Sequence, residues 1–249
     1  MPSYTLTSAD TDAPRQRAQQ VPPRSWWGPV TGIGFVALLV ASFSVAPMPP
    51  AAGATVEAIR TYFVDNAPAV RSYALLQSLA SVLLLLFVCW LSEMVRTEAR
   101  ARLAAAAVLG AGILTLAASL TGAAISATLA SDVAANGDAS LLRALFHLGN
   151  FALNVGDPMV AVLVGAHALA TSRSPWMPRW LTALGLVVAA SWILGSVSII
   201  ATEGPFASPT GPYGLAMVTL LLAWVAAAAL ALSRVAASEN SGLRGPRGP

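Results

Sequence analysis

Six runs of about 20 mostly apolar residues recur along the chain, and they constrain its fold more than any other feature. A helix of that length crosses the hydrocarbon core of a bilayer, because each residue adds about 1.5 Å. The composition agrees, since 56% of the 249 residues are hydrophobic and only 10% are charged. The sequence therefore predicts an all-α membrane protein, a bundle of six transmembrane helices at residues 29–46, 72–94, 103–130, 144–170, 180–201 and 213–234.

Polar segments flank these runs at both ends. Residues 1–28 are rich in Pro, Gln and Arg, and residues 236–249 in Gly, Pro and Arg. We expect both to be disordered cytoplasmic tails around one transmembrane domain at 29–235. The first run ends in Ala-Pro-Met-Pro-Pro at 46–50, but its apolar core exceeds the roughly 7–15 residues of a signal peptide, which favours a retained span over a cleaved one.

The connection after the first span, residues 47–71, contains a helical pattern. Its apolar residues Val56, Ile59, Phe63 and Val64 recur at helical spacing. Two interpretations stay open: a short amphipathic helix on the membrane surface or an ordinary loop helix.

The basic residues, all 14 of them arginine, predict the orientation. Eleven lie on one side of the predicted spans, whereas the other side has only Arg60, Arg71 and Arg143. Cytoplasmic connections carry the excess of basic residues, so both termini are expected in the cytoplasm. The tryptophans expected at the cytoplasmic interface are Trp26, Trp27, Trp90, Trp176 and Trp180. Because the arginines are dispersed between apolar runs, no nucleic-acid partner is expected.

The fourth run carries a polar stripe that a lipid-facing helix would not tolerate. Its members are separated by 4, 3, 4 and 3 residues, so they fall within an arc of roughly 80° on a helix. They are Arg143, His147, Asn150, Asn154 and Asp157. Such a stripe is expected to face the bundle interior or a water-filled cavity.

Asp157 is the most costly member of the stripe. It lies about 21 Å from Arg143 along the helix, near the bilayer midplane, where inserting an aspartate costs about 2.5–3.5 kcal/mol. No predicted span offers it a cation, so Asp157 is expected to be protonated, hydrogen-bonded to neutral groups or hydrated. Candidate partners at similar depth are Thr115, Ser119, Ser191, Trp192 and Trp224.

A predicted helix break adjoins this carboxyl group. Pro158 has no N–H, so the carbonyl of Asn154 loses its helical donor and a bend is expected around Gly156. Transporters bind ions or polar groups at such interrupted helices. The functional interpretation is a site for a proton, a cation or a small polar solute. The alternative is that the stripe only joins packed helices through hydrogen bonds.

Other polar residues have simpler interpretations. Arg143 is expected to anchor the interface, and His167 to lie at the interface near the cytoplasmic end. Glu93, followed by Arg96, is expected to be a solvated charge at a helix end, and Gln77 could reach the stripe.

Motifs for catalysis, cofactors and metals are not found in the sequence. It contains no phosphate-binding glycine loop, no Gly-x-Ser-x-Gly and no His-Glu-x-x-His. Its single cysteine, Cys89, excludes a disulfide within one chain, and two histidines on different helix faces make a poor zinc pair. We expect no enzymatic activity, no cofactor and no metal site.

Three short segments resemble a family of six-span bacterial membrane proteins, frequent in actinobacteria and catalogued as a domain of unknown function. The segments are Met177-Pro-Arg-Trp-Leu-Thr-Ala-Leu-Gly-Leu-Val, Val56-Glu-Ala-Ile-Arg-Thr-Tyr-Phe and Leu141-Leu-Arg-Ala-Leu-Phe-His-Leu-Gly-Asn. The resemblance covers about residues 29–235 and implies a multi-pass protein of the bacterial inner (plasma) membrane. It implies no activity, because the family has none established.

Two functions are consistent with these observations. One is a small ion-coupled or polar-solute transporter built around the stripe of the fourth span. The other is a non-enzymatic structural, sensory or partner-binding membrane subunit. The expected partners are the lipid bilayer and a proton, cation or small polar solute, with an oligomer or a partner membrane protein left open.

Overall fold

The structure, a computed structural model, describes residues 26–98, 101–201, 204, 206 and 211–242, with side chains up to residue 233. Most of the predicted N-terminal tail (1–28) and residues 243–249 of the C-terminal tail lie outside these residues. The α-helices are α2 (Trp27–Val45), α3 (Val56–Asp65), α4 (Ala67–Arg96), α5 (Arg102–Thr128), α6 (Ala134–Asn136), α7 (Ala139–Val155), α8 (Asp157–Thr171), α9 (Arg179–Gly195) and α10 (Pro212–Gly242). A π-helical turn, η2 (Leu129–Val133), follows α5, and a 3-10 turn, η3 (Ser196–Ile199), follows α9.

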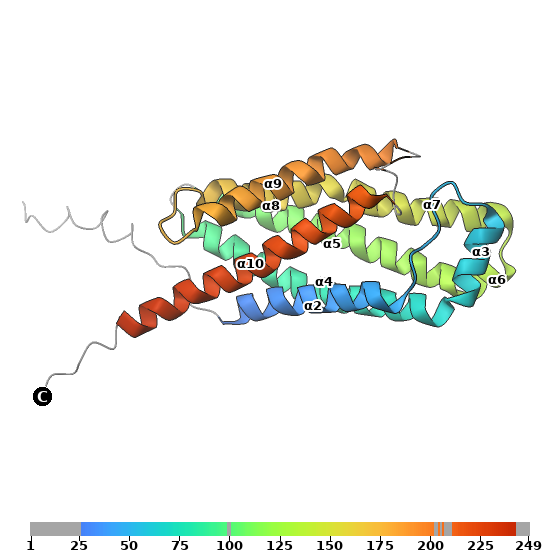
Figure 1. The fold of residues 1–249 in the computed structure, drawn as a ribbon, viewed down its shortest axis with the longest axis horizontal. Helices are drawn as coiled ribbons and strands as arrows, with labels where there is room; N and C mark the ends of the chain where they lie inside the picture. Colours follow the sequence, from blue (N-terminus) through green and yellow to red (C-terminus); the bar gives the residue numbers. More distant parts are fainter. Residues whose placement is uncertain (1–25, 99–100, 202–203, 205, 207–210, 243–249) are drawn as a thin grey trace, which may run out of the picture.

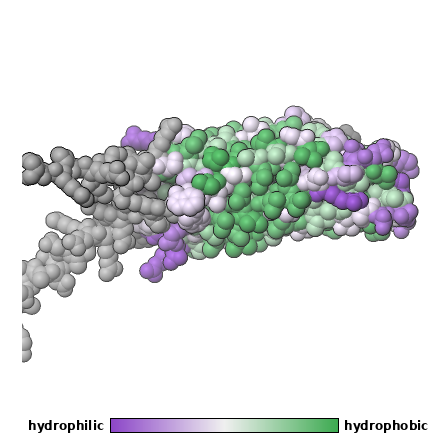
Figure 2. All heavy atoms as spheres, turned by 90° about the horizontal axis from the view of Figure 1, so that it is seen from below, coloured by the Kyte–Doolittle hydropathy of each residue, from purple (hydrophilic) through white to green (hydrophobic). Residues whose placement is uncertain are grey.

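The long helices lie along one axis and form an elongated bundle (Figure 1). Six helical segments are long and apolar enough to cross a membrane, with α7 and α8 together making the fourth. Apolar residues cover the middle of the bundle and hydrophilic ones gather toward its ends (Figure 2). The predicted all-α bundle of six membrane-spanning helices is therefore confirmed, and the protein is a multi-pass membrane protein.

Prolines and polar caps determine where several helices begin. Pro68 and Pro158 lie in the first turns of α4 and α8, where a missing N–H costs no intrahelical bond. The Thr55 side chain accepts a hydrogen bond from the Ala58 N–H at the start of α3, at 3.2 Å. At the other end of the chain, α10 continues to Gly242 and so passes residue 235, because no Gly or Pro occurs between Gly214 and that glycine.

The main core lies where α5 meets its neighbours. This helix contacts α4, α7 and α8, as its small residues predict for a packing helix. Gly112 shows how close the approach is, because a Cβ atom added there would lie 2.4 Å from Cγ1 of Val88 on α4. Only a residue without a side chain fits at this point of the α4–α5 interface.

A second, smaller core lies under α3 at one end of the bundle, which we call the α3 end. The apolar face of α3 is buried against protein, with Ile59 0% and Phe63 4% exposed. They pack with Leu142 and Phe146 of α7, and the rings of Phe63 and Phe146 meet edge to face. The structure thus favours a loop helix docked on the bundle over one that uses this face to bind the membrane surface.

The opposite end, which we call the α8–α9 end, carries the predicted interfacial tryptophans. Trp26 and Trp180 are 78% and 56% exposed, consistent with an interfacial position. Trp90 is only 4% exposed, so its predicted interfacial position is wrong. Gly28 of α2 leaves space for the Trp90 ring, which also packs near Phe87, and this close contact keeps the indole inside the bundle.

Candidate functional site

The fourth span is interrupted beside the stripe. Helix α7 ends at Val155 and α8 begins at Asp157, with Gly156 between them. A Cβ atom added at Gly156 would lie 2.8 Å from the Cβ of Ala118 on α5, so the interruption sits at a close helix contact. The break places the end of one helix against the middle of another.

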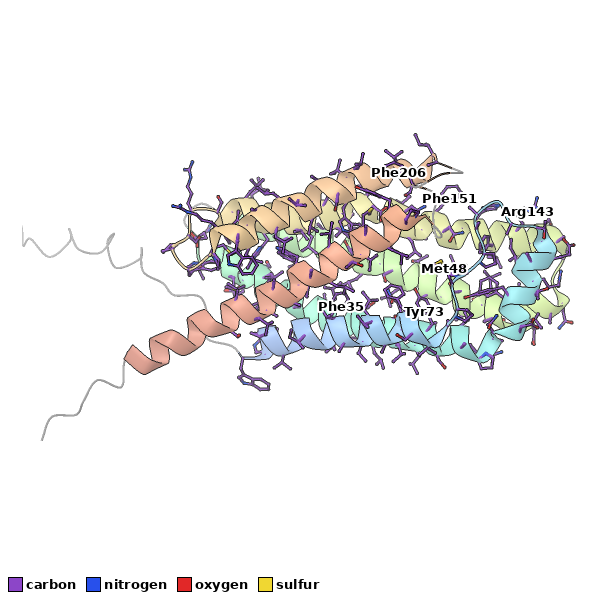
Figure 3. The ribbon with its side chains drawn as sticks, in the orientation of Figure 1. Phe35, Met48, Tyr73, Arg143, Phe151 and Phe206 are labelled. Atoms are coloured by element: carbon purple, nitrogen blue, oxygen red, sulfur yellow. The ribbon has the colours of Figure 1, made fainter. Side chains whose placement is uncertain are left out.

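A cleft opens along α7 at the α3 end, with a volume of about 340 Å³, within the usual range for small-molecule sites. It lies between α7, the loop before α3 and the segment around η3, and Figure 3 shows Arg143 and Phe151 along α7. Its lining residues are Ala52, Gly53, Ala54, Arg143, His147, Asn150, Phe151, Asn154, Ser198, Ile199 and Ala201. Four of the five predicted stripe residues therefore meet in one cleft.

The polar side chains of this cleft are arranged by depth. Arg143 is exposed at the α3 end, His147 and Asn150 are half-buried, and Asn154 is 7% exposed. Arg143 and Asn154 are about 16 Å apart along the helix axis, by the 1.5 Å rise per residue. The cleft thus leads from an exposed arginine toward a nearly buried amide.

These side chains have no hydrogen-bond or ion-pair partner among the described residues. Nδ2 of Asn150 and Oγ of Ser198 are both buried without a partner. A buried donor without an acceptor costs about 1–3 kcal/mol, so these groups are expected to bind water or a ligand. Ser198 was not predicted as a site residue, because nothing in the fifth span indicates that it meets the stripe.

The loop side of the cleft is tied to α3 by one hydrogen bond. The phenol of Tyr62 donates to the carbonyl of Pro47 at 2.7 Å. Burial of the phenol, with a smaller contribution from Tyr73, raises the pKa of Tyr62 to about 12, so it stays a donor at neutral pH. This bond helps to hold the loop that carries Ala52, Gly53 and Ala54 beside α7.

The other two arginines at the α3 end are used differently from Arg143. Arg60 donates to the carbonyls of Ala134, Ala135 and Gly137, and Arg71 donates to the carbonyl of Ala130 through Nε at 3.0 Å and an Nη at 2.8 Å. These carbonyls belong to η2, α6 and the turn that follows, where regular α-helical bonding is interrupted. Arg60 and Arg71 therefore satisfy backbone acceptors.

Asp157 lies apart from the lining of the cleft, one turn beyond Asn154. Its side chain is partly exposed and forms no hydrogen bond or ion pair with the described residues. The predicted partners are engaged elsewhere or not at all: Ser119 accepts from Gln77, Ser191 donates to the Val188 carbonyl, and Trp192 has a buried N–H without an acceptor. The structure brings Arg143, His147, Asn150 and Asn154 together but leaves Asp157 outside.

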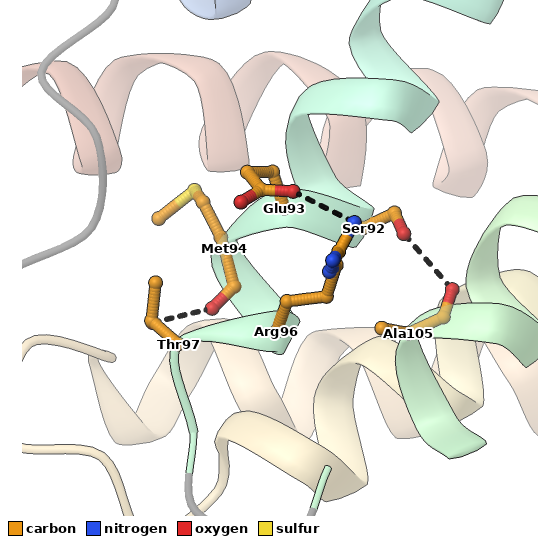
Figure 4. Close-up of polar contacts among 6 residues, drawn as sticks. All are labelled: Ser92, Glu93, Met94, Arg96, Thr97 and Ala105. Carbon is orange, nitrogen blue, oxygen red and sulfur yellow. Dashed lines mark hydrogen bonds and ion pairs between the residues drawn. The ribbon is translucent and has the colours of Figure 1, made fainter. Parts of the chain in front are cut away.

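Hydrogen bonds between spans occur away from the stripe. The hydroxyl of Ser92 on α4 donates to the carbonyl of Ala105 on α5 at 2.9 Å (Figure 4). Nε2 of Gln77 donates to Oγ of Ser119 at 2.8 Å, so Gln77 joins α4 to α5 and does not reach the stripe as proposed. These bonds, and the one from the Tyr213 hydroxyl on α10 to the Ser191 carbonyl on α9, are interhelical hydrogen bonds of the kind that the alternative interpretation assigns to the stripe.

Two polar residues near the α8–α9 end were also predicted from sequence. His167 is fully buried with its ring edge-on to Trp224, so the interfacial prediction is wrong. The error has a physical cause, because the Trp224 ring of α10 packs against the imidazole. Glu93 and Arg96 form an exposed ion pair at 3.5 Å, as expected for solvated helix-end charges.

Glu98 was missed by sequence reasoning. Its Oε1 accepts hydrogen bonds from the Ser174 hydroxyl and from Nε1 of Trp176, so it joins the α4–α5 connection to the α8–α9 connection. No spacing in the sequence links residues so far apart along the chain.

Among the described residues, no group of three His, Cys, Asp or Glu side chains is placed to hold a metal ion. No protein-family model matches the chain, and comparisons with curated proteins and with solved structures give no match. The functional argument therefore depends on the geometry of the cleft.

Proposed function

We propose that this membrane protein binds a small polar solute in the cleft along α7 and carries it across the membrane. The proposal depends on whether the side chains of the stripe are hydrogen-bonded to neighbouring helices. Side chains that only joined helices would be hydrogen-bonded across an interface. Arg143, His147, Asn150 and Asn154 instead face a cleft and have no such bond among the described residues.

The helix break lies directly beyond the deeper part of this cleft. Asn154 lies at its deeper part, and Gly156, Asp157 and Pro158 follow directly. A partly exposed carboxyl group one turn beyond the cleft is suited to bind a proton or a cation that is moved with the solute. We assign the ion-coupling role to Asp157 and the solute-binding role to the cleft.

The proposed orientation follows the arginines. With both termini in the cytoplasm of a bacterial cell, as the positive-inside rule favours, the α3 end lies outside and the cleft opens to the periplasm or exterior. The solute is then taken up from outside or released there.

Water access to the cleft can be tested with the single cysteine of the chain. Cys89→Ala gives a cysteine-free background, in which Asn154→Cys and Val155→Cys are made separately. Val155, the residue after Asn154, is 60% exposed and serves as the lipid-facing control. We expect a membrane-impermeant thiol reagent to label Asn154→Cys and to leave Val155→Cys unlabelled. Equal absence of labelling at both positions would contradict a hydrated cleft.

Transport itself is tested by flux into proteoliposomes, using a panel of anionic, neutral and cationic solutes with and without a pH gradient. We expect at least one solute to enter, with Asn154→Leu reducing its flux and Asp157→Asn abolishing its dependence on the gradient. If no solute of the panel moves while both variants fold normally, the protein is better explained as a structural or partner-binding subunit.

A further inference from the structure

The charge of the cleft limits what it can bind. Among the described residues, Arg143 and His147 are the only ionisable ones that line it, and no described Asp or Glu does. An arginine stays protonated at any physiological pH. The cleft therefore carries positive charge at its exposed end, and its described lining residues include no carboxylate to neutralise that charge.

The guanidinium of Arg143 has no hydrogen-bond or ion-pair partner within the part of the chain that the structure describes. Arg60 and Arg71, at the same end of the bundle, donate hydrogen bonds to backbone carbonyls. Arg143 forms no hydrogen bond with a described residue. Its planar donor set matches a carboxylate or a phosphate in two parallel hydrogen bonds. A cation or a neutral solute would leave this charge without a counter-charge.

Two further donors belong to residues that line the cleft. Nδ2 of Asn150 on α7 and the hydroxyl of Ser198 on η3 are buried without partners, and both residues line the cleft. Asn150 is about 10 Å from Arg143 along α7, by the rise per residue.

From this arrangement we infer that the ligand of the cleft is a small oxyanion, a carboxylate or a phosphate ester, bound by Arg143 together with Asn150 and Ser198. The inference rests on the proposed function, because it names the class of solute for the same site. The headgroup of an anionic lipid offers the same chemistry as a free solute, so the test separates the two sources.

The electrostatic part of the test uses Ala52→Cys, which lines the cleft but is not one of the inferred ligand-binding residues, on the Cys89→Ala background in phosphatidylcholine vesicles. Two methanethiosulfonate reagents are compared, one with a sulfonate and one with a trimethylammonium group. We expect Arg143→Gln to lower the anionic-to-cationic ratio of labelling rates at least about threefold. Arg96→Gln is the control and should leave it unchanged, because Arg96 is exposed at the α8–α9 end beside Glu93. An unchanged ratio in Arg143→Gln would overturn the inference.

The ligand part uses protection from labelling by inorganic phosphate, succinate, glycerol and choline. We expect phosphate or succinate to protect, and Arg143→Gln to raise the half-protecting concentration at least about tenfold, with Arg96→Gln like the parent. If only glycerol or choline protects, or if protection is equal in Arg143→Gln, the anion inference fails and the proposed function stands. If no probe protects and no solute of the flux panel moves, both fail.

A second set of vesicles contains phosphatidylglycerol. Protection that appears there without added anion would place a lipid headgroup in the cleft. That result would support the oxyanion chemistry of the site and overturn a free solute as its source. Protection by phosphate or succinate in phosphatidylcholine alone supports the solute.

Discussion

The α4–α5 interface and the cleft along α7 place polar residues in opposite situations. At the interface, the Ser92 hydroxyl and the Gln77 amide N–H groups donate to groups on the neighbouring helix. Along the cleft, the Asn150 amide and the Ser198 hydroxyl are buried without acceptors. Hydrogen bonds that stabilise the bundle are thus concentrated away from the stripe. Buried atoms without partners also occur on α4 and α5, at Gln77 Oε1 and Thr115 Oγ1, so the contrast lies in the hydrogen bonds between helices, which the interface has and the described stripe residues lack.

The close packing of the α4–α5 interface gives the largest expected effect. Gly112→Val places a side chain against Val88, at a position where even a Cβ would lie 2.4 Å from the Val88 Cγ1. We expect a loss of about 3 kcal/mol in the free energy of unfolding, from overpacking. The measurement is denaturant unfolding in mixed micelles.

Gly110→Val is the matched control for this substitution. It lies on the same helix two residues away, where an added Cβ has nothing within 4 Å. We expect it to unfold like the parent protein. Equal losses from both substitutions would mean that helix propensity, and not packing against α4, determines the effect.

Substitutions of the arginines at the α3 end give the next largest expected change in the free energy of unfolding. Arg71→Met removes two donors from the carbonyl of Ala130, a residue that is 1% exposed. We expect Arg71→Met to lower the free energy of unfolding by about 2 kcal/mol, and Arg143→Met to change it by less than about 0.5 kcal/mol. Thermal unfolding in detergent measures both. A large loss in Arg143→Met would make that arginine a structural residue and weaken the contrast between the two regions.

Smaller changes in stability are expected from Ser92→Ala at the α4–α5 interface and Asn150→Leu in the cleft. Ser92→Ala removes a hydrogen bond from the α4–α5 interface and is expected to cost about 1 kcal/mol. Asn150→Leu removes a buried donor that has no partner, so we expect stability to be unchanged or raised. The unfolding curve of Ser92→Ala should therefore shift toward lower stability. That of Asn150→Leu should stay in place or shift toward higher stability. A loss in Asn150→Leu as large as that in Ser92→Ala would favour a packing role for the stripe.

The spans could be predicted because they depend on local properties. The lengths of the apolar runs set the spans, and the fourth span breaks at Gly156, beside Pro158, where a proline restricts the backbone. The spacing of Arg143, His147, Asn150 and Asn154 also placed them on one face. These properties need no knowledge of which helices become neighbours.

The remaining features depend on tertiary contacts that the sequence does not encode locally. Ser198 meets the stripe only because η3 packs against α7. Trp90 and His167 are buried because α2 and α10 cover them. Depth in the membrane singles out Asp157 as a candidate, whereas the cleft is formed by residues nearer the α3 end. Depth in the membrane indicated which residue is costly, but not which residues share a cavity.

The smallest expected effect concerns the start of α7, the helix that carries the cleft. The Asp138 carboxylate accepts hydrogen bonds from the Ser140 hydroxyl at 2.6 Å and from the Leu141 N–H at 2.8 Å. These bonds lower the pKa of Asp138, the serine bond most, because they favour the charged form. Since the folded pKa is below the unfolded one, the stabilisation is present above the unfolded value of about 4 and is lost as pH falls through the folded value.

Asp138→Asn keeps a capping side chain but cannot titrate, so it isolates this contribution. We expect the difference in unfolding midpoint between the parent and Asp138→Asn to shrink as the pH falls from about 5 to about 3. Ser92→Ala, far from α7, should show a constant difference from the parent over the same range. If the two variants behave alike, the start of α7 is held by its packing under α3, through Leu142 and Phe146, and the cap contributes little. The shape of the cleft would then depend on the small core at the α3 end, and not on the polar side chains that line the cleft.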